Sequence, residues 1–410
     1  MKFVVAGLDV GNGYVKGAIK VDNEVENVFI PSCAMKVKNT GNILPVEGES
    51  AIKEVVTNIF DYLDVSFDSK MIEDGRRRFV GTRAVSMGDY GMDVFKISGN
   101  ISKAKQELSP VLVFTSIAGV VLKKEFEKTG RLPEEIECHV SLAVALPIDE
   151  YKDYRGEYKA SYKNTSHVVS INNFLTPVRI KIVIDNVIVG AEGASAEGAS
   201  AQYAITEYGE PLYNAMLKTA RKYGAELKGL EARHLANIVN TVGIDIGEGT
   251  VNFPVFTNGQ FNTDISTTVN MGYGTVLQES LAMLRKSGHV FKGGRKELAE
   301  YLKNPPAEDD YFYEDYKEVV RIVDDQADTL VNEIVNHLTD ILGSNVQVAY
   351  VYGGGAAPMR EILYPKLIEA TRPYAGVKAD YPILYLGNEY SQNLNREGLY
   401  IMADSYKPVK

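Results

Sequence analysis

A short pattern occurs twice in this sequence, once near its start and once past its middle. Residues 9–13 read DVGNG and residues 245–249 read DIGEG, and each pattern stands between two runs of β-favouring residues. A strand–turn–strand unit that recurs in this way predicts two domains built on one plan. We place these domains at residues 1–206 and 207–410. We expect residues 388–410 to pack back on the first domain, and the active site to lie between the two.

The two turns carry residue types that suit phosphate binding. Glycine lets the backbone approach an anion closely and adopt positive φ, so that backbone amides can point toward the anion. Lys16 follows Asp9 on the returning strand and can add an ammonium group. Asp9 and Asp245 can hold a magnesium ion that keeps most of its waters. Two such loops that face each other would therefore clamp a polyphosphate.

A third glycine segment follows a predicted strand at residues 346–352. Residues 353–355 are three consecutive glycines, and Pro358 stands where a following helix would begin. A wall without side chains suits the flat base and the sugar of a nucleoside. A single glycine turn is more often a plain hairpin, but three such segments in this order favour a nucleotide site.

Hydrophobic periodicity predicts the main helices. Residues 109–129 form an apolar helical segment with Gly130 in the stop position, and residues 316–342 keep the three-and-four spacing of a buried stripe. We predict β structure for residues 154–162 and a strand at residues 251–257, because β-favouring residues are frequent in both.

In this order, the three glycine segments resemble those of the actin superfamily, which includes actins, sugar kinases and heat-shock chaperones. Residues 9–16 resemble the first phosphate loop, residues 245–250 the second, and residues 351–357 the adenosine loop. Glu248 departs from the commoner DxGGGT form of the second loop, although actin itself has an acidic residue there. The resemblance implies an actin-like α/β fold of two related domains with a nucleotide cleft between them.

The resemblance also implies ATP or GTP with Mg²⁺ as cofactors, and a set of residues that bind them. The magnesium ligands would be Asp9 and Asp245. The nucleotide-binding residues would be Gly11, Asn12, Gly13, Tyr14, Lys16, Gly247, Glu248, Gly249, Thr250, Gly353, Gly354, Gly355 and Ala356.

Hydrolysis in this superfamily needs a carboxylate that orients a water molecule opposite the γ-phosphate, just after the strand that links the two halves. Glu192 follows such a predicted strand directly and is our candidate catalytic residue. The sequence Ala-Glu-Gly-Ala-Ser is repeated at residues 191–195 and 196–200, so Glu197 is an alternative. A helix of small residues with exposed glutamates would explain the same pattern without catalysis.

The size of the chain and the motif Asn-x-x-Gly at residues 395–398 resemble ParM-type plasmid segregation actins. These are filament-forming ATPases, some of which also use GTP, that move plasmid copies through a DNA-bound adaptor of the ParR type. The resemblance implies self-association into helical filaments and the same role for this chain. The alternatives are a small-molecule kinase of the same superfamily, for which we find no sugar-binding motif, and a cytoskeletal or cell-shape actin homologue.

Composition restricts the partners further. Acidic side chains outnumber basic ones by 54 to 44, so the net charge of −10 repels nucleic-acid backbones and we expect no direct nucleic-acid binding. The two cysteines, Cys33 and Cys138, and five scattered histidines show no metal-binding spacing. Asp9 interrupts the N-terminal apolar run and neither end is a basic amphipathic helix, so we expect a cytoplasmic protein without membrane attachment.

Overall fold

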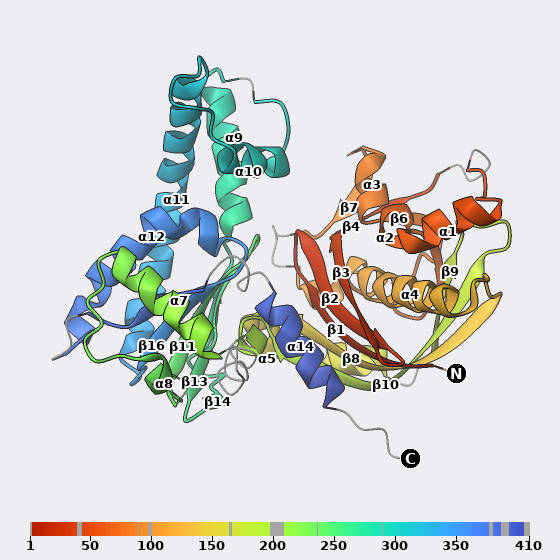
Figure 1. Ribbon diagram of the computed structural model, residues 1–410, viewed down its shortest axis with the longest axis horizontal. Helices are drawn as coiled ribbons and strands as arrows, with labels where there is room; N and C mark the ends of the chain where they lie inside the picture. Colours follow the sequence, from red (N-terminus) through yellow and green to blue (C-terminus); the bar gives the residue numbers. More distant parts are fainter. Residues whose placement is uncertain are drawn as a thin grey trace. The chain divides into compact units, whose positions relative to one another are not determined.

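The computed structural model describes residues 2–38, 43–88, 90–96, 101–163, 166–196, 209–235, 237–289, 291–376, 380–386 and 393–405. The chain forms two compact units, of which the first comprises Met1–Ala199 with Asn393–Lys410 and the second Ser200–Gln392 (Figure 1). The domain border expected at residues 206 and 207 lies outside the described residues and stays a prediction. Each unit combines its own sheet with helices, so the predicted α/β class is confirmed.

The first unit is built on a mixed sheet with the strand order β3-β2-β1-β8-β10-β9-β5-β6-β4-β7. Its strands are β1 (Lys2–Val10), β2 (Tyr14–Val21), β3 (Glu24–Pro31), β4 (Cys33–Lys36), β5 (Asp64–Asp68), β6 (Arg78–Val80), β7 (Met92–Val94), β8 (Glu135–Leu146), β9 (Ser166–Ile171) and β10 (Val178–Ala191). Strands β1, β2 and β3 form an antiparallel meander, whereas β8 runs parallel to both β1 and β10. The carboxyl ends of β1 and β10 therefore lie at the same edge of the sheet. The predicted site residue Asp9 is near the end of β1, and Glu192 directly follows β10.

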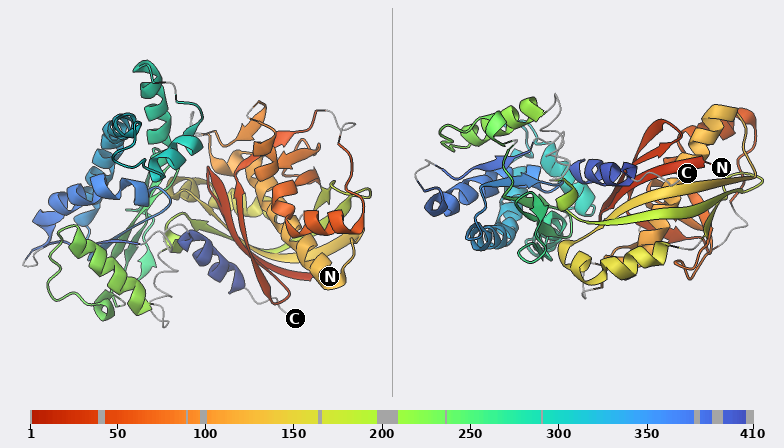
Figure 2. Two further views of the ribbon diagram at one scale, coloured as in Figure 1. Left: turned by 45° about the horizontal axis from the view of Figure 1, so that its top comes forward. Right: turned by 90° about the horizontal axis from the view of Figure 1, so that it is seen from below.

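The helices of the first unit are α1 (Glu49–Thr57), α2 (Ile59–Tyr62), α3 (Thr82–Ser86), the short η2 (Lys103–Lys105), α4 (Leu108–Thr129), α5 (Ile148–Tyr162) and α14 (Leu394–Asp404). Helix α4 confirms the helix predicted at residues 109–129. Its first fifteen residues are all buried, and it ends at Gly130, whose φ of 67° is left-handed. Helix α14 packs against β1 and β8, where it lies beside the red strands in Figure 2.

The β structure predicted for residues 154–162 is wrong, because these residues belong to helix α5. Asp149 and Glu150 stand in the first turn of this helix, where carboxylates favour the positive end of the helix dipole. Tyr158 and Tyr162 are four residues apart and both are buried, with ring centroids 5.2 Å apart. Tertiary packing of one helix face therefore outweighs the β propensity of the tyrosines.

The second unit repeats the hairpin pattern of the first in shorter strands. They are β11 (Thr241–Ile246), β12 (Val251–Phe253), β13 (Val255–Thr257), β14 (Gln260–Phe261), β15 (Thr267–Val269), β16 (Val348–Tyr352) and β17 (Ile383–Tyr385). β11 pairs antiparallel with β12 and β13 and parallel with β16, which in turn pairs with β17. The strand predicted at residues 251–257 is split into β12 and β13 at Pro254, which has no N–H to donate to a ladder.

The helices of the second unit are α7 (Gly209–Lys222), α8 (Ala232–Leu235), α9 (Tyr273–Lys286), α10 (Arg295–Lys303), α11 (Tyr313–Leu342), α12 (Ala356–Thr371) and the short η3 (Arg372–Tyr374). The predicted apolar stripe of α11 is confirmed, since its members from Val319 to Ile341 are buried. α9 packs against both α10 and α11 (Figure 1). None of the described helices is long and apolar enough to cross a membrane.

Candidate functional site

The first predicted phosphate loop is a tight turn between β1 and β2. Asp9 and Lys16 are direct partners across the two antiparallel strands. The N–H of Gly11 donates to the carbonyl oxygen of Tyr14 at 3.0 Å, and a Cβ on Gly11 would come within 2.9 Å of that same oxygen. Ser32 closes the turn from β3's end, because its hydroxyl donates to the carbonyl of Gly11 at 2.6 Å.

The remaining predicted residues of this loop are partly exposed. Asn12 and Gly13 form the turn itself, and the carbonyl oxygen of Gly13 accepts a hydrogen bond from the N–H of Ser32 at 2.8 Å. The ring of Tyr14 stacks on that of Phe29, with centroids 4.6 Å apart and an angle of 12° between the planes. The backbone of this turn is thus held in place while its tip stays accessible to solvent.

Glu192 follows β10 directly and is buried, with only 8% of its surface exposed. Its backbone N–H donates to the carbonyl of Leu146 at the end of β8, at 2.8 Å. Gly193 follows with a left-handed φ of 79°, so the chain turns sharply after Glu192. The alternative candidate, Glu197, lies outside the described residues.

Lys103 is a member of this site that the sequence analysis missed. Its ammonium nitrogen lies 2.5 Å from Oε1 of Glu192, and the Lys103 side chain is 5% exposed. Burial lowers the pKa of Lys103, but the negative charges of Glu192 and Asp9 outweigh that effect and the pKa is raised. The ammonium group therefore stays charged in the interior. No motif surrounds Lys103, so no signal in the sequence points to it.

Asp9, Lys16, Lys103 and Glu192 form one group of interacting charges in the first unit. Burial raises the pKa of Asp9 to about 6, since it outweighs the opposing attraction of Lys16; Glu192 raises the pKa further and Lys103 lowers it. The negative charges of the two carboxylates are thus balanced by the positive charges of the two ammonium groups. A buried carboxylate whose charged form is costly is a suitable ligand for an added cation.

The second predicted phosphate loop has the same closure as the first. The N–H of Gly247 donates to the carbonyl of Thr250 at 2.9 Å. The start of α9 covers the loop from one side, because the N–H groups of Tyr273 and Gly274 donate to the carbonyls of Gly247 and Glu248 at 3.0 Å and 2.8 Å. The loop is therefore shaped by backbone hydrogen bonds, as the glycine pattern predicts.

The residues around this loop differ in exposure. Asp245 and Thr250 are buried, at 5% and 9% exposure. The side chain of Glu248 is about a third exposed and makes an ion pair with Arg295 at the start of α10, with Oε1 and Nη1 3.2 Å apart. A cation beside Glu248 offsets the extra negative charge that this residue adds to the loop.

The glycine segment at residues 353–355 lies directly against the second loop. The N–H of Gly355 donates to the carbonyl of Ile246 at 2.8 Å. Gly353 has a φ of +95°, and a Cβ there would meet Oδ1 of Asp245 at 2.5 Å. Gly354 is exposed, and a Cβ on it would meet no atom within 4 Å. The structure therefore brings together the second loop, Asp245 and the glycine segment in the second unit.

Ala356 begins helix α12 and is buried. Residues 353–356 thus connect β16 to α12, and Gly355 joins this segment to the strand before the second loop. Within the described residues, no group of three or more His, Cys, Asp or Glu side chains is arranged as a metal cage. A magnesium ion that keeps most of its waters needs only one or two carboxylates.

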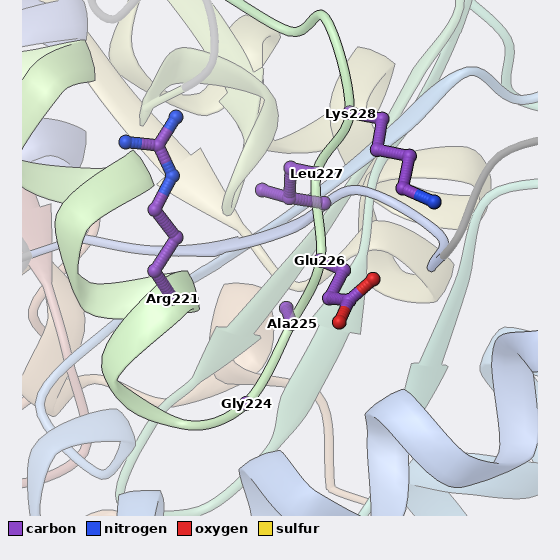
Figure 3. Close-up of a pocket in the computed structure, with 6 residues that line it drawn as sticks. All are labelled: Arg221, Gly224, Ala225, Glu226, Leu227 and Lys228. Carbon is purple, nitrogen blue, oxygen red and sulfur yellow. The ribbon is translucent and has the colours of Figure 1, made fainter.

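A separate hollow of about 480 Å³ lies in the second unit, at the end of α7. It is lined by Arg221, Gly224, Ala225, Glu226, Leu227 and Lys228 (Figure 3). In Figure 3, the charged groups of Arg221 and Lys228 point away from each other. None of the predicted site residues lines this hollow, so it is not part of the candidate nucleotide site.

Comparisons with known proteins agree with this architecture. The family model "Actin like proteins N terminal domain" matches residues 7–194, and "Archaeal actin homologue MreB-like, C-terminal" matches residues 243–364. The first match includes Asp9 and Glu192, and the second includes Asp245 and the glycine segment. No curated protein matches the sequence.

Several solved structures share the fold over almost the whole chain. An archaeal actin homologue, Ta0583, has a TM-score of 0.57 and 14% identity, and the match covers 99% of this chain and 100% of that one. ParM of Bacillus thuringiensis with ATP has a TM-score of 0.55 and 18% identity, and the match covers 98% of each chain. A 15-stranded ParM filament from Clostridium botulinum has a TM-score of 0.60 and 16% identity, and the match covers 99% of each chain. These two family matches and the shared fold show that this chain has an actin-like fold.

Proposed function

We propose that this protein is a nucleotide-dependent, filament-forming actin homologue that hydrolyses ATP or GTP. The observation that carries the proposal is the buried charge group of the first unit, in which Glu192 is held by Lys103 beside Asp9 and Lys16. A carboxylate fixed next to a candidate cation ligand, Asp9, and a candidate phosphate-binding lysine, Lys16, is placed to orient a water molecule. Structural packing alone does not need three buried charges, those of Asp9, Lys103 and Glu192, in one place.

The predicted residues of the two loops, the glycine segment and Glu192 each have a role in this proposal. The N–H groups of Gly11 and Gly247 close the two turns, and the amides of residues 12–13 and 248–250 bind phosphate oxygens, whose charge Lys16 neutralises in part. Asp9 and Asp245 hold magnesium, which supplies positive charge that stabilises the transferring phosphoryl group. Glu192 orients the attacking water. The exposed backbone at Gly354 leaves space for a nucleoside, which supports the role of residues 353–356 as its wall.

Self-association into filaments is supported by the similarity to the ParM filament from Clostridium botulinum. Nucleotide binding is supported by the ParM structures of Bacillus thuringiensis, which were solved with ATP, ADP and AMPPNP. We further propose plasmid segregation through a DNA-bound adaptor of the ParR type as the biological role. Under this proposal the filament itself binds no DNA, so duplex DNA alone does not pellet with it.

The first experiment is light scattering and high-speed pelleting of the purified protein with magnesium and ATP, GTP or ADP, with phosphate release followed in parallel. We expect assembly with a triphosphate and not with ADP, followed by disassembly as phosphate appears. Turnover without assembly, accelerated by a sugar or another small acceptor, would identify a kinase instead. Duplex DNA, added with and without a ParR-type adaptor, tests the adaptor: it should pellet only when the adaptor is present.

A further inference from the structure

We propose that Asn395 is a positioning residue for hydrolysis, which holds the turn after Glu192 through its side-chain oxygen. The inference rests on the proposed role of Glu192. Asn395 stands at the start of α14, in the part of the chain that returns to the first unit after the second unit ends at Gln392. It is separated from Glu192 by the whole second unit in sequence, yet the two lie in one unit of the structure.

The side chain of Asn395 makes two hydrogen bonds to the turn after Glu192. Oδ1 of Asn395 accepts one hydrogen bond from the backbone N–H of Gly193 at 3.0 Å and a second from the hydroxyl of Ser195, also at 3.0 Å. An amide oxygen has two lone pairs, so these two donors use its full accepting capacity. The donors belong to the first and third residues after Glu192, so one side chain ties down the turn that follows the candidate catalytic residue.

Helix α14, which contains Asn395, packs closely against the turn after Glu192 and against the sheet. A Cβ on Gly398 would come within 1.9 Å of the carbonyl oxygen of Ser195, so α14 touches this turn with its backbone. Further along, a Cβ on Gly7 of β1 would lie 2.3 Å from the backbone nitrogen of Tyr400. The hydroxyl of Ser141 on β8 donates to the carbonyl of Ala403 at 2.9 Å. The helix is thus fixed against the sheet at several points.

Glu192 is consequently held from three sides. Its own N–H donates to Leu146 and its carboxylate accepts from Lys103, while the N–H of Gly193 and the hydroxyl of Ser195 donate to Asn395. Gly193 has no Cβ and adopts a left-handed φ, and the hydrogen bond to Asn395 fixes the direction of its N–H. A displacement of a reacting group by about 1 Å can cost about 10²-fold in rate, so this contact bears on hydrolysis.

The test compares Asn395→Leu, which removes the acceptor at similar size, with Asn395→Asp, which keeps an acceptor oxygen. Ser195→Ala removes one donor and leaves the bond to Gly193. We expect Asn395→Leu to release phosphate about 10- to 100-fold more slowly, with the affinity for fluorescent ATP analogue changed less than about threefold. Asn395→Asp should recover most of the rate, and Ser195→Ala should lie between wild type and Asn395→Leu. Equal loss in Asn395→Asp and Asn395→Leu, or a wild-type rate in Asn395→Leu, overturns the proposal.

A double-mutant cycle separates positioning from a merely structural role. If Asn395 acts through Glu192, Asn395→Leu has no further effect on phosphate release in a Glu192→Gln background. An unchanged additional loss there contradicts positioning. If Glu192→Gln itself hydrolyses like wild type, the proposed function of Glu192 fails; if Glu192→Gln is slow and Asn395→Leu is not, only the present inference fails. Should Asn395→Leu not fold, Asn395→Asp and Ser195→Ala decide the question by the same measurements.

Discussion

The ammonium nitrogen of Lys103 lies 2.5 Å from Oε1 of Glu192 in the interior of the first unit. Both side chains are almost completely buried, and Asp9 contributes a second negative charge nearby. A buried ion pair of this kind contributes little net stability, since desolvation of both charges offsets their attraction. The presence of Lys103 beside Glu192 is therefore better explained by how it holds the carboxylate than by what the pair adds to folding.

Loss of one partner of this pair should destabilise the protein strongly. Lys103→Ala leaves Glu192 buried without its cation, which we expect to lower the free energy of unfolding by about 3–5 kcal/mol. The double variant Lys103→Ala/Glu192→Ala removes both charges and should recover at least half of that loss. Urea unfolding of the two variants and of Glu192→Ala measures the coupling. Additive effects would show that the pair does not interact.

Glu192→Gln keeps the size of the side chain but removes the carboxylate charge. We expect phosphate release to fall by about 10²- to 10⁴-fold, the range of general-base assistance, while nucleotide binding and triphosphate-dependent assembly are retained. Glu49→Gln is a matched control, because Glu49 is an exposed glutamate at the start of α1. Phosphate release by Glu192→Gln at the rate of this control would exclude Glu192 as the catalytic carboxylate.

The glycine segment offers two neighbouring substitutions with opposite expectations for stability. At Gly353 the left-handed φ and the contact with Asp245 leave no room for a methyl group, so Gly353→Ala should lose about 2–4 kcal/mol. At Gly354 the space is open, so Gly354→Ala should fold within about 0.5 kcal/mol of wild type. Thermal and urea unfolding measure both.

Gly354→Ala also tests the nucleoside wall. If a base or sugar rests against this backbone, the added methyl group should weaken nucleotide binding although the free protein is as stable as before. Titration of a fluorescent nucleotide against wild type and Gly354→Ala measures the difference. Identical affinities would place the nucleoside elsewhere.

His167 should make stability depend on pH. It is fully buried on β9, its Nδ1 lies 2.8 Å from the Ser69 hydroxyl, and its ring stacks on Phe114 with centroids 4.2 Å apart. Burial lowers the pKa of His167 from 6.5 to about 4. As pH falls below 6.5 the unfolded chain takes up a proton that the folded chain accepts only near pH 4, so this contribution is full above pH 6.5 and is lost on acidification.

The size of this effect follows from linkage and amounts to at most about 3 kcal/mol between pH 6.5 and 4. His167→Gln cannot titrate, so its stability should fall less over this interval than that of wild type. The difference between the two unfolding free energies, measured by urea titration at each pH, cancels the contributions of all other groups. Parallel curves for the two proteins would contradict a buried neutral histidine.

Local features of this protein were predictable from sequence. Asp9 and Lys16 face each other because a tight turn between two short strands determines their register. The stripe of α11 and the end of α4 at Gly130 follow from helical periodicity and from the left-handed conformation that glycine adopts. The tyrosines of α5 were misassigned, because packing of one helix face, which propensity does not contain, decides their conformation.

The sequence by itself determined the hairpins, the three glycine turns and the residue types at their ends, because the hydrogen bonds and periodicities behind them span only a few residues. The tertiary structure alone decided which distant side chains meet: Lys103 with Glu192, Asn395 with Gly193, and Gly355 with the strand that ends at Ile246. These contacts depend on how strands and helices far apart in the chain pack together, and no local pattern records that packing.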